Sequence, residues 1–206
     1  MYSISMSVAV EAVRIHISRS ASVGVGPLIS SLMPTSLVGG PQPLHARQGR
    51  EMQRYSQDGA RLVAGCIPVR VSEVNGKVDV SVLMITSRGG KGLVFPKGGW
   101  EADETVEAAA ARETVEEAGV RGALEDDMVG AFPFKSNKAA RKHTAEQGRC
   151  VAHMFVMHVA EELPTWPEGA ERKRIWCSAE KAVELCRHDW MRDALKVWLQ
   201  KQKTSV

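Results

Sequence analysis

The hydrophobic pattern of the chain first predicts a pair of β-strands. Residues 62–71 and 78–86 are apolar runs rich in β-branched side chains. Asn75-Gly76 lies between them, and this dipeptide tolerates the positive φ angles of a tight hairpin turn. We therefore expect two antiparallel strands. Pro68 interrupts the first run, and because proline has no N–H for the ladder, we expect it at an edge position or a β-bulge.

A helix is predicted next, at residues 104–117. This segment contains an alanine block from Ala108 to Ala111, has no internal glycine or proline, and is followed by Gly119 as a C-cap. The order of strands, helix, strands and helices predicts a mixed α/β layered domain with one core and no internal repeat. The further strands are expected at Val129–Phe132, Cys150–Val159 and Arg174–Cys177, and the further helices at Ala179–Arg187 and Trp190–Lys201.

The first 50 residues differ in composition from the rest. They are rich in serine, include the stretch Gly39-Gly40-Pro41-Gln42-Pro43, and lack the periodicity of a core. The chain has a formal net charge of +3, and four arginines against one glutamate in this leader account for it. Basic, serine-rich, acid-poor segments are typical of organelle transit peptides, and a disordered tail is the equal alternative. We expect residues 1–50 to be one of these and residues 51–206 to form the folded domain.

Composition and cysteine spacing exclude several classes of protein. No apolar run approaches the roughly 18 residues of a membrane helix, so no membrane partner is expected. Basic and acidic residues balance over residues 51–206, which argues against a histone-like protein. No two cysteines make the close pair that a zinc site or redox dithiol requires, so we expect reduced thiols inside the cell: in the cytoplasm or nucleus, or in a mitochondrion or plastid if the leader is a transit peptide. The cysteines are Cys66, Cys150, Cys177 and Cys186.

Residues with candidate chemistry gather at the first predicted helix. Glu113, Glu116 and Glu117 stand at i, i+3 and i+4, so a helix places their carboxylates on one face within about 6 Å of one another. Crowded oxygen ligands of this kind need a cation, and they suit Mg²⁺ or Mn²⁺. Gly98-Gly99 permit a tight turn near the helix start, where a carbonyl of Lys97 or Gly98 can join the metal ligands. This loop disfavours the alternative of a merely solvated acidic face.

Two other polar residues have expected supporting roles. Arg112 precedes Glu116 by four residues, so it can hold that carboxylate by a charge-assisted hydrogen bond. Glu104 lies a turn away from the metal-binding face, and we expect it to pair locally or to bind an auxiliary ion.

The spacing of these residues matches the Nudix box, G-x5-E-x7-R-E-U-x-E-E-x-G-U, in which U is aliphatic. Thr114 replaces the first aliphatic residue and leaves the charged positions intact. The chain thus resembles the Nudix hydrolase family. The resemblance implies an α/β/α sandwich with a mixed sheet and a loop-helix-loop catalytic motif. The matching residues are Gly98, Glu104, Arg112, Glu113, Glu116, Glu117, Gly119 and Val120.

The resemblance also implies a reaction, the metal-dependent hydrolysis of a diphosphate joined to a further group. Divalent ions neutralise the charge of the transition state and lower the pKa of an attacking water. Glu117 is the first candidate for the catalytic metal ligand, followed by Glu113 and then Glu116. The general base stays open, because family members differ in where it sits. A ligand-sensing domain without turnover is the weaker alternative, because such domains commonly lose box carboxylates.

Outside the box, residues 54–200 resemble the diphosphoinositol polyphosphate phosphohydrolase branch, including its plant members. The similar segments are Arg54-Tyr55, Arg61–Arg70, Ser87-Arg88, Phe95–Glu101, Arg141–His143 and Glu171–Trp176. This resemblance implies that basic side chains grip the phosphates of an inositol ring. The substrate-binding residues expected on this basis are Arg61, Ser87, Arg88, Lys97, Arg141, Lys142, His143 and Lys173.

Two basic clusters, at residues 135–149 and 172–174, favour a small-molecule substrate with many phosphates. A diphosphoinositol polyphosphate fits best, and a diadenosine polyphosphate or another nucleoside diphosphate derivative is the alternative. An RNA cap is a lesser option, since no RNA-binding region is appended. We expect a monomer without a nucleic-acid partner. Five tryptophans could stack on a base, although core packing is their commoner use: Trp100, Trp166, Trp176, Trp190 and Trp198.

Overall fold

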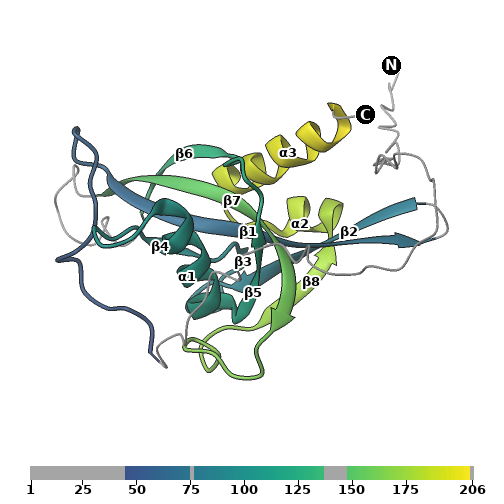
Figure 1. The fold of residues 1–206 in the computed structure, drawn as a ribbon, viewed down its shortest axis with the longest axis horizontal. Helices are drawn as coiled ribbons and strands as arrows, with labels where there is room; N and C mark the ends of the chain where they lie inside the picture. Colours follow the sequence, from purple (N-terminus) through teal and green to yellow (C-terminus); the bar gives the residue numbers. More distant parts are fainter. Residues whose placement is uncertain (1–44, 75–76, 137–147, 205–206) are drawn as a thin grey trace, which may run out of the picture.

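A mixed β-sheet is the frame of the protein (Figure 1). The computed structural model describes residues 45–74, 77–136 and 148–204. The predicted hairpin strands are present as β1 (Arg61–Val74) and β2 (Lys77–Thr86), which pair antiparallel with Val69 opposite Val82. Asn75-Gly76, the predicted turn, lies outside the described residues.

β1 lies in the centre of the sheet. On one side it runs parallel to β7 (Arg149–Glu162), and on the other it pairs with β4 (Lys97–Gly99) and then with β2. β7 continues the sheet to β5 (Val120–Leu124) and β6 (Gly130–Lys135). β2 continues it to β3 (Leu93–Val94) and β8 (Arg174–Ser178).

Pro68 is not at an edge or in a bulge, and that expectation was wrong. β1 has partners on both sides, and its register with β7 is continuous through Pro68. Cys66 donates its N–H to the carbonyl of Pro96 on the β4 side, and residue 68, two positions further, faces the same side. Pairing with β4 ends at Gly65 and pairing with β2 begins at Val69. The missing N–H therefore falls in a gap between two partner strands, where no donor is required.

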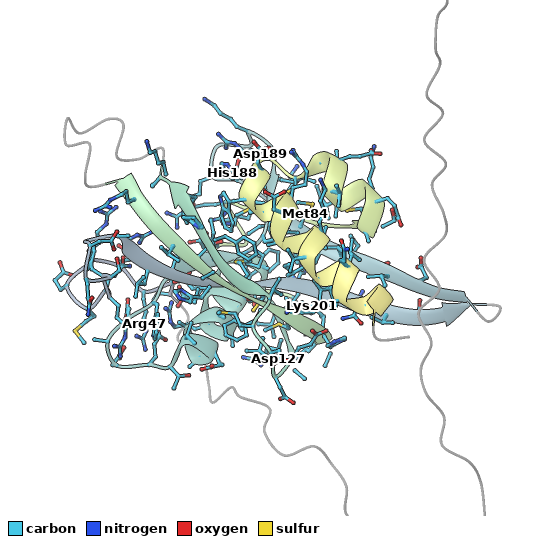
Figure 2. The ribbon with its side chains drawn as sticks, turned by 90° about the horizontal axis from the view of Figure 1, so that it is seen from above. Arg47, Met84, Asp127, His188, Asp189 and Lys201 are labelled. Carbon is cyan, nitrogen blue, oxygen red and sulfur yellow. The ribbon has the colours of Figure 1, made fainter. Side chains whose placement is uncertain are left out.

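Helices cover both faces of the sheet (Figures 1 and 2). The helix expected at residues 104–117 is α1 (Val106–Ala118), which packs on β1, β4 and β5. The last two expected helices are α2 (Ala179–Leu185) and α3 (Asp189–Thr204), which lie on the opposite face, with α3 beside β6. The protein therefore has the expected α/β architecture. None of the helices in the described residues is long and apolar enough to cross a membrane.

Apolar side chains from the strands and helices fill the core. Trp198 of α3 is the largest of the fully buried side chains, and its indole N–H donates to Glu125 at 3.0 Å. All the cysteines are free thiols, and burial raises the pKa of the Cys66 thiol to about 12. These thiols are packing residues, in agreement with the spacing argument.

The short strands β3, β4 and β5 were not predicted, and Gly122 explains why β5 was missed. Glycine weakens a strand pattern in a sequence. In β5, however, a Cβ at residue 122 would lie 1.9 Å from the carbonyl oxygen of His158 on β7. The register with β7 also shifts between Arg121 and Gly122. The close approach of β5 to β7 thus requires glycine at residue 122, and this glycine is also the reason that the sequence pattern did not predict a strand.

Candidate active site

The two ends of α1 set the position of the glutamate face. Thr105 caps the helix, because its side-chain oxygen accepts a hydrogen bond from the N–H of Ala108 at 3.2 Å. Gly119 ends the helix in the left-handed conformation, with φ of 62°, and its N–H donates to the carbonyl of Val115. A Cβ on Gly119 would lie 2.6 Å from the ring of Trp166. The helix end therefore needs glycine for both conformation and space.

Arg112 ties the helix to the loop before it. Its guanidinium makes a bidentate pair with Glu104, at 3.0 Å from Nε and 2.8 Å from Nη2, and Nη2 also donates to the carbonyl of Gly99. Nη1 donates to Glu113 at 2.8 Å and to Glu116 at 3.2 Å. Burial alone would lower the pKa of Arg112, but the hydrogen bond with Glu104 and the charge of Glu113 outweigh burial and raise the pKa. Arg112 thus holds Glu116, as their spacing suggests, and Glu104 pairs locally.

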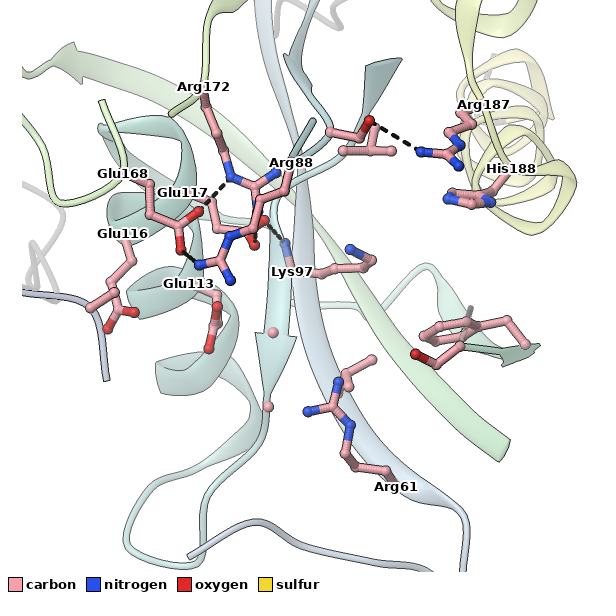
Figure 3. A pocket seen from close by; sticks show the side chains of 18 of the residues that line it. Arg61, Arg88, Lys97, Glu113, Glu116, Glu117, Glu168, Arg172, Arg187 and His188 are labelled. Atoms are coloured by element: carbon pink, nitrogen blue, oxygen red, sulfur yellow. Dashed lines mark hydrogen bonds and ion pairs between the residues drawn. The ribbon is translucent and has the colours of Figure 1, made fainter. Parts of the chain in front are cut away.

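Glu113, Glu116 and Glu117 face a common pocket (Figure 3). Burial raises the pKa of Glu113 to about 8, against the opposing charge of Arg112 and with the help of the other two carboxylates. Burial also raises the pKa of Glu116 and of Glu117, although nearby cationic groups oppose the rise. The three groups together form a poorly solvated excess of negative charge, which a divalent cation relieves.

Strand β4 brings main chain up to the glutamate face. A Cβ on Gly98 would lie 2.0 Å from a carboxylate oxygen of Glu113, and the N–H of Lys97 donates to Glu117 at 3.0 Å. Lys97 and Gly98, the expected main-chain positions of the metal site, are therefore beside two of the glutamates. In the described part of the chain, no three His, Cys, Asp or Glu side chains are grouped to hold an ion as they stand. The carboxylates are instead turned toward arginines, and the oxygen-rich donor set fits a hard cation once they turn.

A second charged group lies beside Glu117 (Figure 3). Arg172, in the loop between β7 and β8, donates from Nη2 to Glu117, from Nε to Glu168 at 2.5 Å, and from Nη1 to the carbonyl of Thr86 at 3.1 Å. Arg88 donates to the other oxygen of Glu168. Of these side chains, Glu168 and Arg172 were not predicted as site residues. The i, i+4 spacing of Glu168 and Arg172 could have predicted their ion pair. The hydrogen bond from Arg172 to Glu117 joins residues far apart in the sequence, and no local pattern predicts it.

These groups open into a pocket of about 620 Å³ (Figure 3). The glutamates lie at one end, and Arg187 and His188 lie across the pocket from them. Burial and the charges of Lys97 and Arg187 lower the pKa of His188, which indicates a positive potential at that end. The basic and aromatic residues that line the pocket are Arg47, Arg61, Arg88, Lys91, Lys97, Phe134, Lys135, Arg172, Arg187, His188 and Trp190.

The predicted substrate-binding residues divide into three groups. Arg61, Ser87, Arg88 and Lys97 line the pocket, where Ser87 accepts a hydrogen bond from Arg187 at 3.1 Å. Lys173 does not line this pocket: its side chain is exposed, whereas the neighbouring Arg172 points inward. The remaining three, Arg141, Lys142 and His143, lie outside the described residues.

The end of the leader reaches the glutamates, which the sequence did not reveal. The N–H of Arg47 donates to Glu116 at 3.2 Å. Its guanidinium forms ion pairs with Glu101 at 2.5 Å and with Asp103 at 3.0 Å. The hydrogen bond with Glu101 is the main cause of the raised pKa of Arg47. This segment therefore borders the pocket at its acidic end.

Among the tryptophans, Trp190 lines the pocket and stacks on Phe134, with 4.8 Å between ring centroids. The other four pack elsewhere in the described residues. Trp100, Trp166 and Trp176 each lie under an arginine side chain, and Trp198 is in the core.

Comparison with known proteins gives a consistent result. The family model described as NUDIX domain matches residues 60–199. Nudix hydrolase 16, mitochondrial, of Arabidopsis thaliana is 55% identical over 159 residues, which cover 74% of this chain and 86% of that protein. Nudix hydrolase 21, chloroplastic, from the same plant is 42% identical over 160 residues, or 77% of this chain and 76% of that protein.

Solved structures match the fold at low sequence identity. A NUDIX hydrolase from Nitrosomonas europaea has a TM-score of 0.53 and 16% identity, and the match covers 70% of this chain and 91% of that one. A C. elegans Ap4A hydrolase binary complex has a TM-score of 0.50 and 18% identity, over 68% of this chain and 96% of that one. At sequence identities this low, the similarity supports a common fold and nothing further.

Proposed function

Because the chain belongs to the Nudix family of hydrolases, we propose that it cleaves the pyrophosphate bond of diphosphoinositol polyphosphates and releases phosphate. The observation that carries the substrate proposal is the composition of the pocket. The three glutamates of α1 and Glu168 lie at one end, and seven Lys or Arg side chains besides Arg47 also line the pocket. A substrate with phosphates on several sides of a compact ring suits this wall better than one with a single pyrophosphate, because each extra phosphate meets a cation.

The glutamates are proposed to hold the cation of the reaction. Nudix hydrolases generally need a divalent metal ion, and Mg²⁺ or Mn²⁺ suits the carboxylates of Glu113, Glu116 and Glu117 and the main chain of Lys97 and Gly98. When bound, such an ion screens the phosphate charge and lowers the pKa of an attacking water. Arg112 orients two of the carboxylates, those of Glu113 and Glu116.

The basic side chains are proposed to orient the substrate. Arg172 and the N–H of Lys97 contact Glu117, and Arg88 pairs with the adjacent Glu168, so these side chains suit the scissile diphosphate. Arg61 and Arg187 lie on other sides of the pocket and suit ring phosphates. This division fixes the diphosphate at the acidic end, where attack takes place, and holds the ring in the basic part.

A diadenosine polyphosphate is the alternative substrate. Trp190, stacked on Phe134, gives the pocket an aromatic wall on which a base could stack. An adenine on that wall places its phosphate chain along Lys97 and Arg88 toward the glutamates.

A parallel assay of four substrates tests the proposal: an inositol pyrophosphate, diadenosine hexaphosphate, ADP-ribose and capped RNA. We expect the highest kcat/KM for the inositol pyrophosphate and a steeper loss of it with salt, because more charge pairs are screened. Arg61→Ala should raise KM for the inositol substrate more than for diadenosine hexaphosphate. A preference of the unaltered enzyme for a nucleotide contradicts the inositol assignment, and so does an equal rise in KM for both substrates in Arg61→Ala. Neither result contradicts the assignment of the protein as a Nudix hydrolase.

We further propose that residues 1–50 are a targeting leader and that residues 51–206 act as a monomer. Two Arabidopsis relatives carry mitochondrial or chloroplastic in their names, and the leader composition suits either organelle. A fluorescent protein fused to residues 1–50 should enter mitochondria or plastids. A diffuse signal in cytoplasm and nucleus identifies the leader as a passive tail.

A further inference from the structure

We propose that Glu168 is a positioning residue, which holds Arg88 and Arg172 in the pocket and so couples cation binding at Glu117 to phosphate binding. The inference rests on the proposed function, because it takes the pocket to receive phosphate groups. Glu168 lies in the loop between β7 and β8 and belongs to neither the glutamate face of α1 nor the basic positions inferred from the sequence.

The carboxylate of Glu168 is fully engaged. One oxygen accepts from Arg88 and the other from Nε of Arg172, and its side chain is only 7% exposed. Because both oxygens already accept hydrogen bonds from arginines, we assign Glu168 a positioning role and not that of the general base.

The main chain of Glu168 is fixed as firmly as its side chain. Its N–H donates to the carbonyl of Glu116 at 3.1 Å, which anchors the loop to the catalytic helix. Its own carbonyl accepts from the N–H groups of Glu171 and Arg172 at 3.0 Å. The carboxylate is therefore held at a set place relative to the glutamate face.

Arg88 depends on this anchor for its direction. Its side chain is 52% exposed, and its other ion pair in the described residues is a longer one, 3.5 Å from Glu171. A planar guanidinium that binds a carboxylate along one edge keeps N–H groups free on the others. Glu168 thus holds Nη2 of Arg88, and the rest of the guanidinium stays available to a phosphate in the pocket.

Arg172 gives the coupling between cation and phosphate. It donates to Glu117, an expected cation ligand, and to Glu168 at the same time. A cation that engages Glu117 competes with Arg172 for that carboxylate. Because Arg172 keeps Glu168 and the carbonyl of Thr86, it stays in place, and its Nη2 becomes available to a phosphate oxygen.

The test compares Glu168→Gln with Glu171→Gln in the full chain. Glu171 is three residues away and 62% exposed, and the substitution removes the same charge. Binding of Mn²⁺ alone is followed by electron paramagnetic resonance, and binding of methylenediphosphonate with Mn²⁺ by calorimetry, since its P–C–P bridge is not hydrolysed. Steady-state kinetics then separate KM from kcat.

In Glu168→Gln we expect methylenediphosphonate to bind about tenfold more weakly, as for the loss of a charge-assisted hydrogen bond. KM should rise by a similar factor, with kcat within about twofold of the parent. Mn²⁺ alone should also bind severalfold more weakly, because Glu117 becomes the remaining carboxylate partner of Arg172. Glu171→Gln removes only the longer, exposed contact with Arg88 and should change each of these by less than about twofold. Equal effects in the two variants, or a loss of kcat at unchanged KM, overturns the proposal.

Two further arms keep the test decisive. If Glu168→Gln does not fold, Arg88→Lys replaces it: a lysine cannot bind Glu168 and present a second edge to phosphate, so methylenediphosphonate affinity should fall, and unchanged affinity overturns the proposal. If the unaltered enzyme does not hydrolyse an inositol pyrophosphate, the proposed substrate is wrong. The Mn²⁺ and methylenediphosphonate titrations then still decide the role of Glu168.

Discussion

At the scale of single residues, Gly98 and Glu113 decide whether main chain and carboxylate can meet. Gly98 lies opposite Ala64 in the pairing of β4 with β1, so the sheet fixes its backbone position. The hydrogen bond from Arg112 fixes the carboxylate of Glu113. Because neither group can move far, their close approach depends on the absence of a side chain at residue 98.

Gly98→Ala should reduce kcat/KM by about a hundredfold, since a displacement of about 1 Å at a catalytic group has an effect of that size. Its Cβ would lie 2.0 Å from the Glu113 carboxylate. Gly130→Ala is the control, because there the new Cβ meets only the Phe132 side chain, at 3.2 Å. Activity of Gly98→Ala close to that of the control shows that Glu113 can move without loss.

Glu117→Gln should lower kcat by about 10²-fold or more, because it removes one ligand charge where negative charge must be balanced in the transition state. Chelation should abolish activity of the parent, and added Mg²⁺ or Mn²⁺ should restore it. Glu107→Gln, an exposed position in the first turn of the same helix, serves as the charge-matched control. Near-parental turnover of Glu117→Gln removes Glu117 from the metal site.

Local spacing explains which site residues the sequence could predict. Glu113, Glu116, Glu117 and Arg112 lie within two turns of one helix, so their common face follows from the helical repeat. Glu168 meets Arg88 across 80 positions of the chain, and no local pattern encodes such a contact.

At the scale of elements, end signals and apolar runs determine which helices and strands can be predicted from the sequence. Gly119 is a recognisable C-cap, and the long strands β1, β2 and β7 have clear apolar runs, so these elements were predictable from the sequence. The start of the helix was less so, because the N-cap Thr105 lies inside the predicted range 104–117. β3 and β4 are only two and three residues long, too short for any periodicity to show. They form because the sheet offers them partner strands, which is tertiary information.

Gly119→Ala should lower the free energy of unfolding by about 2 kcal/mol more than Gly59→Ala, in line with the usual cost of overpacking. Both glycines have positive φ, 62° and 79°, so both variants share the strain of the left-handed conformation. A Cβ meets Trp166 at residue 119, whereas nothing lies within 4 Å of it at residue 59. Urea denaturation measures the difference, and equal destabilisation means that Trp166 moves aside freely.

At the scale of the whole molecule, the pocket is assembled from distant segments. Its wall takes residues from the leader end, β1, the loop after β2, α1, β6, the loop before β8 and the turn before α3. The sequence predicted the acidic end and part of the basic wall. It did not reveal which of the adjacent residues Arg172 and Lys173 points inward, because a loop has no fixed repeat that assigns its side chains to a face.

Arg172→Gln should therefore raise KM by about tenfold, the effect of losing a charge-assisted contact, while Lys173→Gln should stay within about twofold. Both remove one positive charge, so the pair separates a contact in the pocket from a general electrostatic attraction. Kinetics at two salt concentrations complete the comparison. If the two variants lose equal affinity and high salt removes the loss, long-range attraction and not contact is responsible.

The hydrogen bond from the N–H of Arg47 to Glu116 gives the proposed targeting leader a further consequence, if that leader is removed by cleavage. A cut before residue 45 keeps this hydrogen bond, whereas a cut after residue 47 removes it and leaves Arg112 as the partner of the Glu116 carboxylate. The two forms share Glu113, Glu116 and Glu117 and differ in how readily Glu116 accepts a cation. Arg47→Glu, which sets like charge against Glu101 and Asp103, should imitate the shorter form by binding Mn²⁺ more tightly than Arg50→Glu. Under the proposal of a cleaved leader, the position of the cut therefore sets the metal concentration that the enzyme requires.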